Sequence, residues 1–139
     1  MSAIRLTDRI SRDAASIWLL AQLLVAMTLA QILVAWIPLR HYARWLRRAR
    51  VAPAAPPPLV RSIRRKVRIA ARWLPWHPQC LPQALAARVV LDLRGYGSVL
   101  SLGVADEGRQ LSAHAWLKSG ELFVCGRQEY AKYGEVARF

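Results

Sequence analysis

Residues 14–39 restrict the fold more than any other part of the sequence, because none of them carries a charge. The apolar run is interrupted only by Ser16, Gln22, Thr28, Gln31 and Pro38. A helix of about 24 residues, rising about 1.5 Å per residue, reaches about 36 Å and could cross a bilayer core. The sequence therefore predicts one long hydrophobic helix near the beginning of the chain.

The sequence does not decide whether this helix contacts a membrane or packs against protein. The arginine-rich stretch Arg40–Arg48, with Trp36, Tyr42 and Trp45 beside it, is typical of a membrane interface with the basic side in the cytoplasm. A signal peptide fits less well, because its charged region would come first and a small-residue cleavage site would follow, which does not fit the arginines after Pro38. Polar interruptions of the run suit packing against protein instead. We expect a cytoplasmic protein, either free or at the inner face of the cell membrane through 14–39.

The net charge is +13, from 21 Lys and Arg against 8 Asp and Glu, and no acid occurs between Ala14 and Leu91. Such a balance indicates an acidic partner, which could be nucleic acid, an anionic membrane or an acidic protein face. Two cysteines exclude a disulfide-rich scaffold. The three histidines, His41, His77 and His114, lack the spacing of a structural zinc site, so neither metal nor cofactor is expected.

Three segments are predicted: a hydrophobic helix with a basic exit at 1–50, a Pro/Ala-rich linker at 51–58, and a folded unit at 59–139. Residues 61–74 place apolar side chains on one helical face and arginines opposite. This pattern is typical of a solvated basic face. Nucleic-acid binding is the alternative, but no nucleic-acid-binding fold is recognisable, and no nucleic-acid partner is expected.

Cys80 is predicted to stand at the beginning of a helix. Pro78 and Pro82 stop an earlier helix, Pro82 suits the first helical turn, and Gly95 ends the apolar periodicity. Free backbone N–H groups at a helix start favour a thiolate and can form part of an oxyanion site.

Alternating or turn-bounded segments after this helix predict strands at 98–104, 111–118 and 121–124, with a short one at 136–139. A helix followed by an antiparallel meander gives an α+β fold. A thiol at a helix start and His114 on a strand form the nucleophile and base pair of papain-like and transglutaminase-like enzymes. Each alone is also compatible with a core role, Cys80 as a small buried hydrophobe and His114 as a structural imidazole.

The combined spacing of several strings extends this observation. CLPQALAARVVLDLRGYGSVLSLGV, then LSAHAWL, a turn glycine and VCG, together with PLRHYARWLRR and the terminal VARF, resembles the transglutaminase-like cysteine peptidases of lasso peptide biosynthesis. The resemblance covers roughly residues 30–139. It implies a transglutaminase-like or papain-like core, in which a Cys-bearing helix packs on a small antiparallel sheet. A long hydrophobic helix and a basic helix would precede this core.

The resemblance also implies roles. Cys80 would be the nucleophile, His114 the general base and later acid, and Trp116 a neighbour of the imidazole. The reaction would remove the leader from a ribosomally made precursor peptide. The implied partners are the precursor leader, a separate leader-recognition protein and the lasso cyclase, because no recognition domain is visible in 139 residues.

Two positions depart from the family. The family commonly supplies an Asp about a dozen residues after the His, where this chain has Cys125 and Gly126, and Lys118 stands where the family often has Glu. His114 could be oriented by a backbone carbonyl, by Gln128 or Glu129, or by a group from a partner. Cys125 is expected to be a buried strand residue.

Two other functions remain open. One is a non-catalytic, basic, membrane-associated scaffold, and the other is protein cross-linking by acyl transfer on the same cysteine and histidine.

Overall fold

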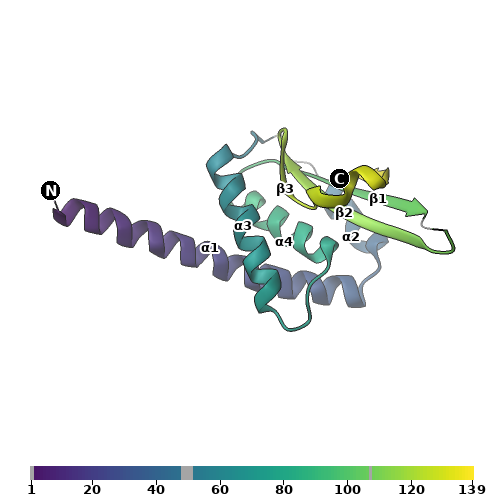
Figure 1. Ribbon diagram of the computed structural model, residues 1–139, viewed down its shortest axis with the longest axis horizontal. Helices are drawn as coiled ribbons and strands as arrows, with labels where there is room; N and C mark the ends of the chain where they lie inside the picture. The colour runs from purple at the N-terminus through teal and green to yellow at the C-terminus, as the bar shows by residue number, and fades with distance from the viewer. Residues whose placement is uncertain (1, 48–51, 107) are drawn as a thin grey trace.

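The structure, a computed structural model, describes residues 2–47, 52–106 and 108–139, without the side chains of residues 2, 129 and 130. The elements follow in the order α1 (Ser2–Trp36), α2 (Leu39–Arg47), α3 (Pro57–Trp73), α4 (Cys80–Leu93), β1 (Val99–Asp106), β2 (Leu111–Ser119), β3 (Leu122–Cys125), a 3-10 helix η1 (Arg127–Lys132) and β4 (Gly134–Arg138) (Figure 1).

The four strands form one sheet in the order β3-β2-β1-β4, and neighbouring strands are antiparallel. β1, β2 and β3 make the predicted meander. β4 instead crosses to the far side of β1 after η1. α4 lies between α1 and the sheet, contacting α1 on one side and β2 and β3 on the other (Figure 1). The α+β prediction, with a Cys-bearing helix packed on a small antiparallel sheet, is confirmed.

α1 begins well before the uncharged run from which it was predicted. Asp8 with Arg12, and Arg9 with Asp13, stand four residues apart, a spacing at which opposite charges favour a helix. The described residues before Ser16 are exposed, and this part of α1 extends away from the remaining elements in Figure 1. α1 is long and apolar enough to cross a membrane by length and composition, with 22% of its most apolar window buried.

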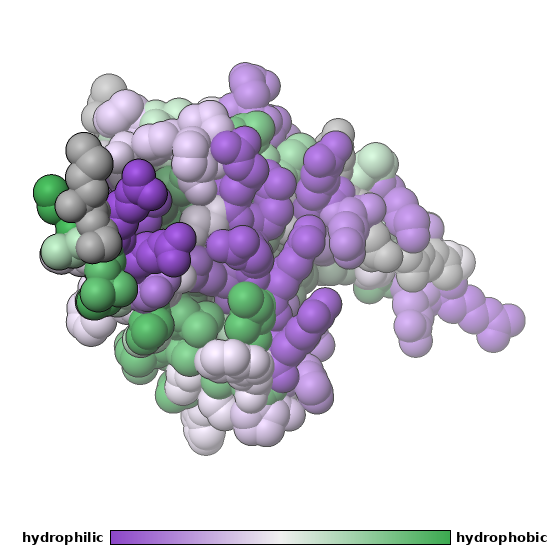
Figure 2. Space-filling model, turned by 60° about the vertical axis from the view of Figure 1, so that its left-hand side comes forward, coloured by the Kyte–Doolittle hydropathy of each residue, from purple (hydrophilic) through white to green (hydrophobic). Residues whose placement is uncertain are grey.

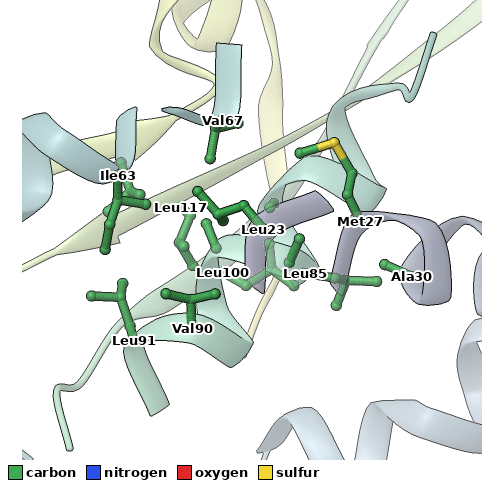
Figure 3. Close-up of a cluster of buried hydrophobic side chains, with 14 of the residues drawn as sticks. Leu23, Met27, Ala30, Ile63, Val67, Leu85, Val90, Leu91, Leu100 and Leu117 are labelled. Atoms are coloured by element: carbon green, nitrogen blue, oxygen red, sulfur yellow. The ribbon is translucent and has the colours of Figure 1, made fainter. Parts of the chain in front are cut away.

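One face of α1 belongs to the core. Leu19, Leu23, Met27 and Ala30 recur at helical spacing and are buried. Figure 3 shows this face meeting buried side chains from the other helices and from the sheet. Those partners are Ile63 and Val67 of α3, Leu85, Val90 and Leu91 of α4, Leu100 of β1 and Leu117 of β2. The long helix and the sheet therefore share a single hydrophobic core.

The proline-rich segment is attached to the sheet. Gly97 N–H donates to the Pro53 carbonyl at 2.9 Å, and Ala55 N–H donates to the Ser119 hydroxyl at 2.9 Å. α3 then begins at Pro57, since proline is favoured in the first turn. Residue 51 of the predicted linker lies outside the described residues. The division into 1–50, 51–58 and 59–139 stays a prediction.

Candidate active site

Cys80 is the first residue of α4, as predicted. Gln79 before it is extended, and the Gln83 side chain donates from Nε2 to the Pro78 carbonyl at 2.7 Å. This bond ties the first turn of the helix to the loop that leads into it. His77 in that loop has φ of 46°, in the left-handed region that few non-glycine residues adopt. Cys80 itself is partly exposed.

His114 lies on β2, and its Nε2 is 2.8 Å from the backbone oxygen of Gly126. A carbonyl oxygen can only accept, so Nε2 carries the hydrogen in this bond. In the neutral ring Nδ1 is then the free acceptor, which is the atom that can take a proton. Gly126 is twelve residues after His114. This is the sequence interval at which the resemblance described above led us to expect an Asp.

Gly126 adopts a backbone conformation, in a confined space, that a residue with a side chain could not adopt without strain. Its φ is +81°, and a Cβ there would lie 2.5 Å from the Ala115 oxygen and 2.7 Å from Trp116 Cα. The glycine allows the chain to turn tightly at the end of β3, where its carbonyl meets His114.

Two aromatic rings hold the imidazole. Tyr133 stacks on it with ring centroids 5.0 Å apart, and Trp116 packs at 6.0 Å, as the resemblance implied. Tyr133 is held in turn by Ser112, at 3.0 Å between the two hydroxyl oxygens. Gly103 is paired with His114 across the sheet, and a Cβ there would lie 2.8 Å from both Trp116 and Tyr133. The missing side chain leaves room for both rings.

Cys80 and His114 line two neighbouring cavities. The first, of about 320 Å³, lies between α3, β3 and the start of η1, and the second, of about 490 Å³, extends toward α1, α2 and β1. Among the residues that the structure describes, only Cys80 and His114 line both cavities. The thiol and the imidazole therefore stand where the two cavities meet.

Within the described chain, Cys80 and His114 share these walls without a hydrogen bond between them. Catalytic hydrogen bonds are often long before a substrate is bound. The arrangement leaves the thiol accessible and fixes the imidazole through its other nitrogen.

The remaining positions considered in the sequence have these places. Cys125 ends β3 as a strand residue, but it is partly exposed rather than buried as expected, and it lines the first cavity; loss of solvent around its thiol raises the pKa to about 12. Lys118 lies over the Phe123 ring at 5.0 Å. Gln128 lines the first cavity, whereas the Glu129 side chain lies outside the described part of the chain. Of the candidates for orienting His114 that the structure describes, the backbone carbonyl of Gly126 is the one that contacts the ring.

Sequence reasoning missed Tyr133, Gly103 and three arginines of the first cavity, Arg64, Arg68 and Arg127. The arginines were visible as charge, but nothing in the sequence brings α3 and η1 together beside Cys80. The twelve-residue interval to Gly126 was a signal for the orienting carbonyl, although it could not exclude other acceptors of the His114 hydrogen bond.

The described residues contain no group of three or more His, Cys, Asp or Glu that could hold a metal ion. A family model described as the transglutaminase-like superfamily matches residues 21–138. Comparisons with curated proteins and with solved structures found no match.

Proposed function

Since the chain belongs to the transglutaminase-like superfamily, we propose that it is a cysteine peptidase whose catalytic pair is Cys80 and His114. Membership supports cysteine-protease-type activity in general, and the residues that perform it are our assignment. The observation that carries the assignment is the position of the pair, since Cys80 and His114 alone among the described residues line both cavities.

In the first half of the reaction, Cys80 acts as the nucleophile. Nδ1 of His114 takes the thiol proton once substrate binding brings the two residues into contact, and the sulfur attacks the peptide carbonyl. Pro82 has no N–H, so the donors for the oxyanion at this helix start are the N–H groups of Cys80 and Leu81. His114 then returns its proton to the departing amine, which leaves a thioester on Cys80.

In the second half, His114 removes a proton from water, which attacks the thioester and releases the carboxylate product. The Gly126 carbonyl fixes the ring and the tautomer through both steps. A neutral carbonyl stabilises an imidazolium less than the carboxylate of a complete triad does. The site can therefore run acyl transfer with a dyad and a backbone acceptor.

The substrate that we propose is a ribosomally made lasso precursor peptide, cleaved at the junction between leader and core. A separate leader-recognition protein would deliver the leader, and a cyclase would join the freed core amine to an acidic side chain. The sequence strings around Cys80 and His114 support this substrate.

The test is reconstitution with the precursor and the recognition protein, followed by mass spectrometry of leader release. Release should require the wild-type chain and be lost in Cys80→Ala and His114→Ala. A Cys80→Ala chain that releases the leader as fast as wild type would remove the proposal. Product carrying a new amide bond to an added amine would instead favour the cross-linking alternative.

We further propose that α1 touches an anionic membrane surface with the face it does not bury. Trp18, Val25 and Leu29 are at least 60% exposed and line an apolar groove with Trp45 of α2 and Leu93 of α4. Arginines of α2, the helix that contributes Trp45 to this groove, suit anionic headgroups. Because the opposite face of α1 is part of the core, the helix would lie along the interface.

Flotation with phosphatidylglycerol vesicles tests this contact. The wild-type chain should float with the vesicles, and Trp18→Asp or Leu29→Asp should reduce the bound fraction. Leu111→Asp, at an exposed apolar position on β2, is the control and should float normally. Absence of flotation, or equal loss in all three variants, would contradict the membrane contact. Flotation without any activity dependent on Cys80 would favour the non-catalytic scaffold.

A further inference from the structure

The cavity between α3 and η1 has a cationic wall beside Cys80. Arg64 and Arg68 stand four residues apart on α3, so they share one helical face, and Arg127 begins η1 directly after Gly126. None of the described residues that line this cavity is acidic. Figure 2, which brings the α3 side of Figure 1 forward, shows hydrophilic side chains across the middle of the face.

These arginines have no carboxylate partner within the described side chains. Arg64 is oriented by β3, since its Nε and Nη2 both donate to the Phe123 carbonyl, at 3.0 and 2.5 Å. Arg68 and Arg127 are exposed, so both can turn toward a bound group. Three guanidinium groups that face one cavity without an internal anion form a site for a carboxylate, which binds guanidinium through paired hydrogen bonds.

The second cavity differs in chemistry. Its wall includes Val34, Leu39, Leu102 and Val136, and it contains no Arg or Lys among its described lining residues. Because Cys80 and His114 lie between the cavities, an extended peptide would place its two halves in different surroundings.

We propose that the cavity of Arg64, Arg68 and Arg127 binds a carboxylate side chain of the peptide substrate, on one side of the bond that Cys80 attacks. The inference rests on the proposed peptidase function, because it takes the bound carboxylate to belong to a peptide substrate. Binding of a carboxylate at this site does not itself require catalysis. It makes an acidic residue close to the scissile bond a specificity determinant of the enzyme.

Cleavage of a positional-scanning peptide library, read by mass spectrometry, tests the specificity. Asp and Glu should exceed Asn and Gln by about five- to tenfold at one position on a single side of the cleaved bond, a modest factor because the guanidinium groups are solvated. Arg68→Gln and Arg127→Gln should bring the ratio close to one. Arg65→Gln makes the same change of charge on α3 outside the cavity, and it should keep the preference.

A binding experiment separates this inference from catalysis. The Cys80→Ala chain is titrated with a neutral Ala/Gly peptide that carries one Asp, and with its Asn counterpart, while the side-chain Nε–Hε signals of arginine are followed by NMR. The Asp peptide should shift the signals of Arg68 and Arg127 and leave that of Arg65 unchanged, and added salt should weaken the effect.

The carboxylate site would be overturned if the Asp and Asn peptides caused equal shifts. It would also be overturned if the Arg65 signal shifted as much as those of Arg68 and Arg127. Selective binding, combined with no cleavage of library members and no leader release in the reconstitution with precursor and recognition protein, would retain the site and remove the peptidase function. Cleavage without any preference for Asp or Glu would retain the peptidase function and remove the carboxylate site.

Discussion

At the scale of single residues, the two thiols of the chain have unequal surroundings. Both residues are partly exposed, and Cys80 stands at a helix start, whereas loss of solvent around the Cys125 thiol raises its pKa to about 12. A hydrogen bond with the backbone of Leu117 opposes this rise in pKa, and the nearby Cys80 adds to it. At neutral pH, Cys125 therefore stays protonated and is a poor nucleophile.

The first prediction concerns selective alkylation. Iodoacetamide at pH 7 should modify Cys80 and leave Cys125 unmodified, because a thiol with a pKa of about 12 is ionised in only about one molecule in 10⁵. The rate at Cys80 should fall in His114→Ala. Peptide mapping by mass spectrometry identifies the modified residue. Equal slow labelling of both cysteines would contradict the assignment.

The second prediction concerns Gly126. Gly126→Ala forces a Cβ against Ala115 and Trp116 at a φ of +81°, so the carbonyl should move away from His114. We expect ester or peptide turnover to fall by about 10², the usual contribution of an oriented general base. Thermal denaturation should also report lost stability, of about 1–3 kcal/mol for the strained backbone.

Gly95→Ala is the matched control for this variant. Gly95 has the same φ of +81°, but a Cβ there would meet nothing within 4 Å. It should lose stability through the backbone alone and keep its turnover. If both variants have the same turnover, the Gly126 carbonyl does not orient the imidazole.

The sequence predicted the site only in part. The helix start at Cys80, the strand with His114 and the neighbouring Trp116 followed from prolines, alternation and a family resemblance. The orienting group did not, because a carbonyl belongs to every residue, and only the turn at Gly126 directs this one toward His114. Tyr133 gave no signal, since it reaches the ring from the residue after η1, nineteen positions after His114.

At the scale of elements, Arg88 joins three parts of the fold. It lies on α4 and is buried, and it donates to the Leu46 backbone oxygen at 2.6 Å and to the Phe139 oxygen at 3.0 Å. Burial lowers the pKa of its guanidinium, and Asp92 opposes this shift. The end of α2 and the residue after β4 are thus fastened to the helix that starts with Cys80.

The third prediction is that Arg88→Met destabilises the fold by about 2–4 kcal/mol, because the Leu46 oxygen loses the guanidinium that donates to it and the Phe139 oxygen keeps only the Leu100 N–H. Urea unfolding followed by circular dichroism measures this change. Arg94→Met is the control. Arg94 directly follows α4, and its removal breaks only a 3.5 Å contact from its side chain to the Val90 oxygen, so the loss of stability should be far smaller. Equal stability of Arg88→Met and wild type would show that the hydrogen bonds from Arg88 to Leu46 and Phe139 do not stabilise the fold.

Elements with a clear local pattern were predicted well. α3, α4 and the three strands of the meander agree with the helical and alternating periodicities of the sequence. η1 was not predicted, and neither was the pairing of β4 with β1, because that register depends on a distant strand. The amphipathic pattern of α3 also failed to indicate Lys66, which is buried and donates to Ser62 at 2.9 Å.

At the scale of the whole molecule, α1 has one face in the core and another face that is exposed. Its inner face contributes Leu23 and Met27 to the common core, and its outer face is apolar and exposed. The family match begins at residue 21, inside this helix. The part of α1 before Ala14 makes little contact with the remaining structure, since its described residues are exposed.

The fourth prediction follows from this division. A chain that begins at Ala14 should unfold at the same temperature as the full chain, within measurement error. Leu23→Ala in the full chain should lose about 2–5 kcal/mol, the usual cost of truncating a buried leucine. Differential scanning calorimetry measures both variants. If the truncated chain were as unstable as Leu23→Ala, the residues before Ala14 would contribute to the stability of the fold, contrary to this prediction.

The most direct test of the proposed dyad needs no knowledge of the natural substrate. The chain is mixed with p-nitrophenyl acetate, quenched in acid at short times, and mapped by mass spectrometry while nitrophenol is recorded. We predict a burst of nitrophenol, a transient acetyl thioester on Cys80, and loss of turnover in His114→Ala. Acetylation that avoids Cys80, or turnover that persists unchanged in Cys80→Ala, would contradict the claim that these two residues act together.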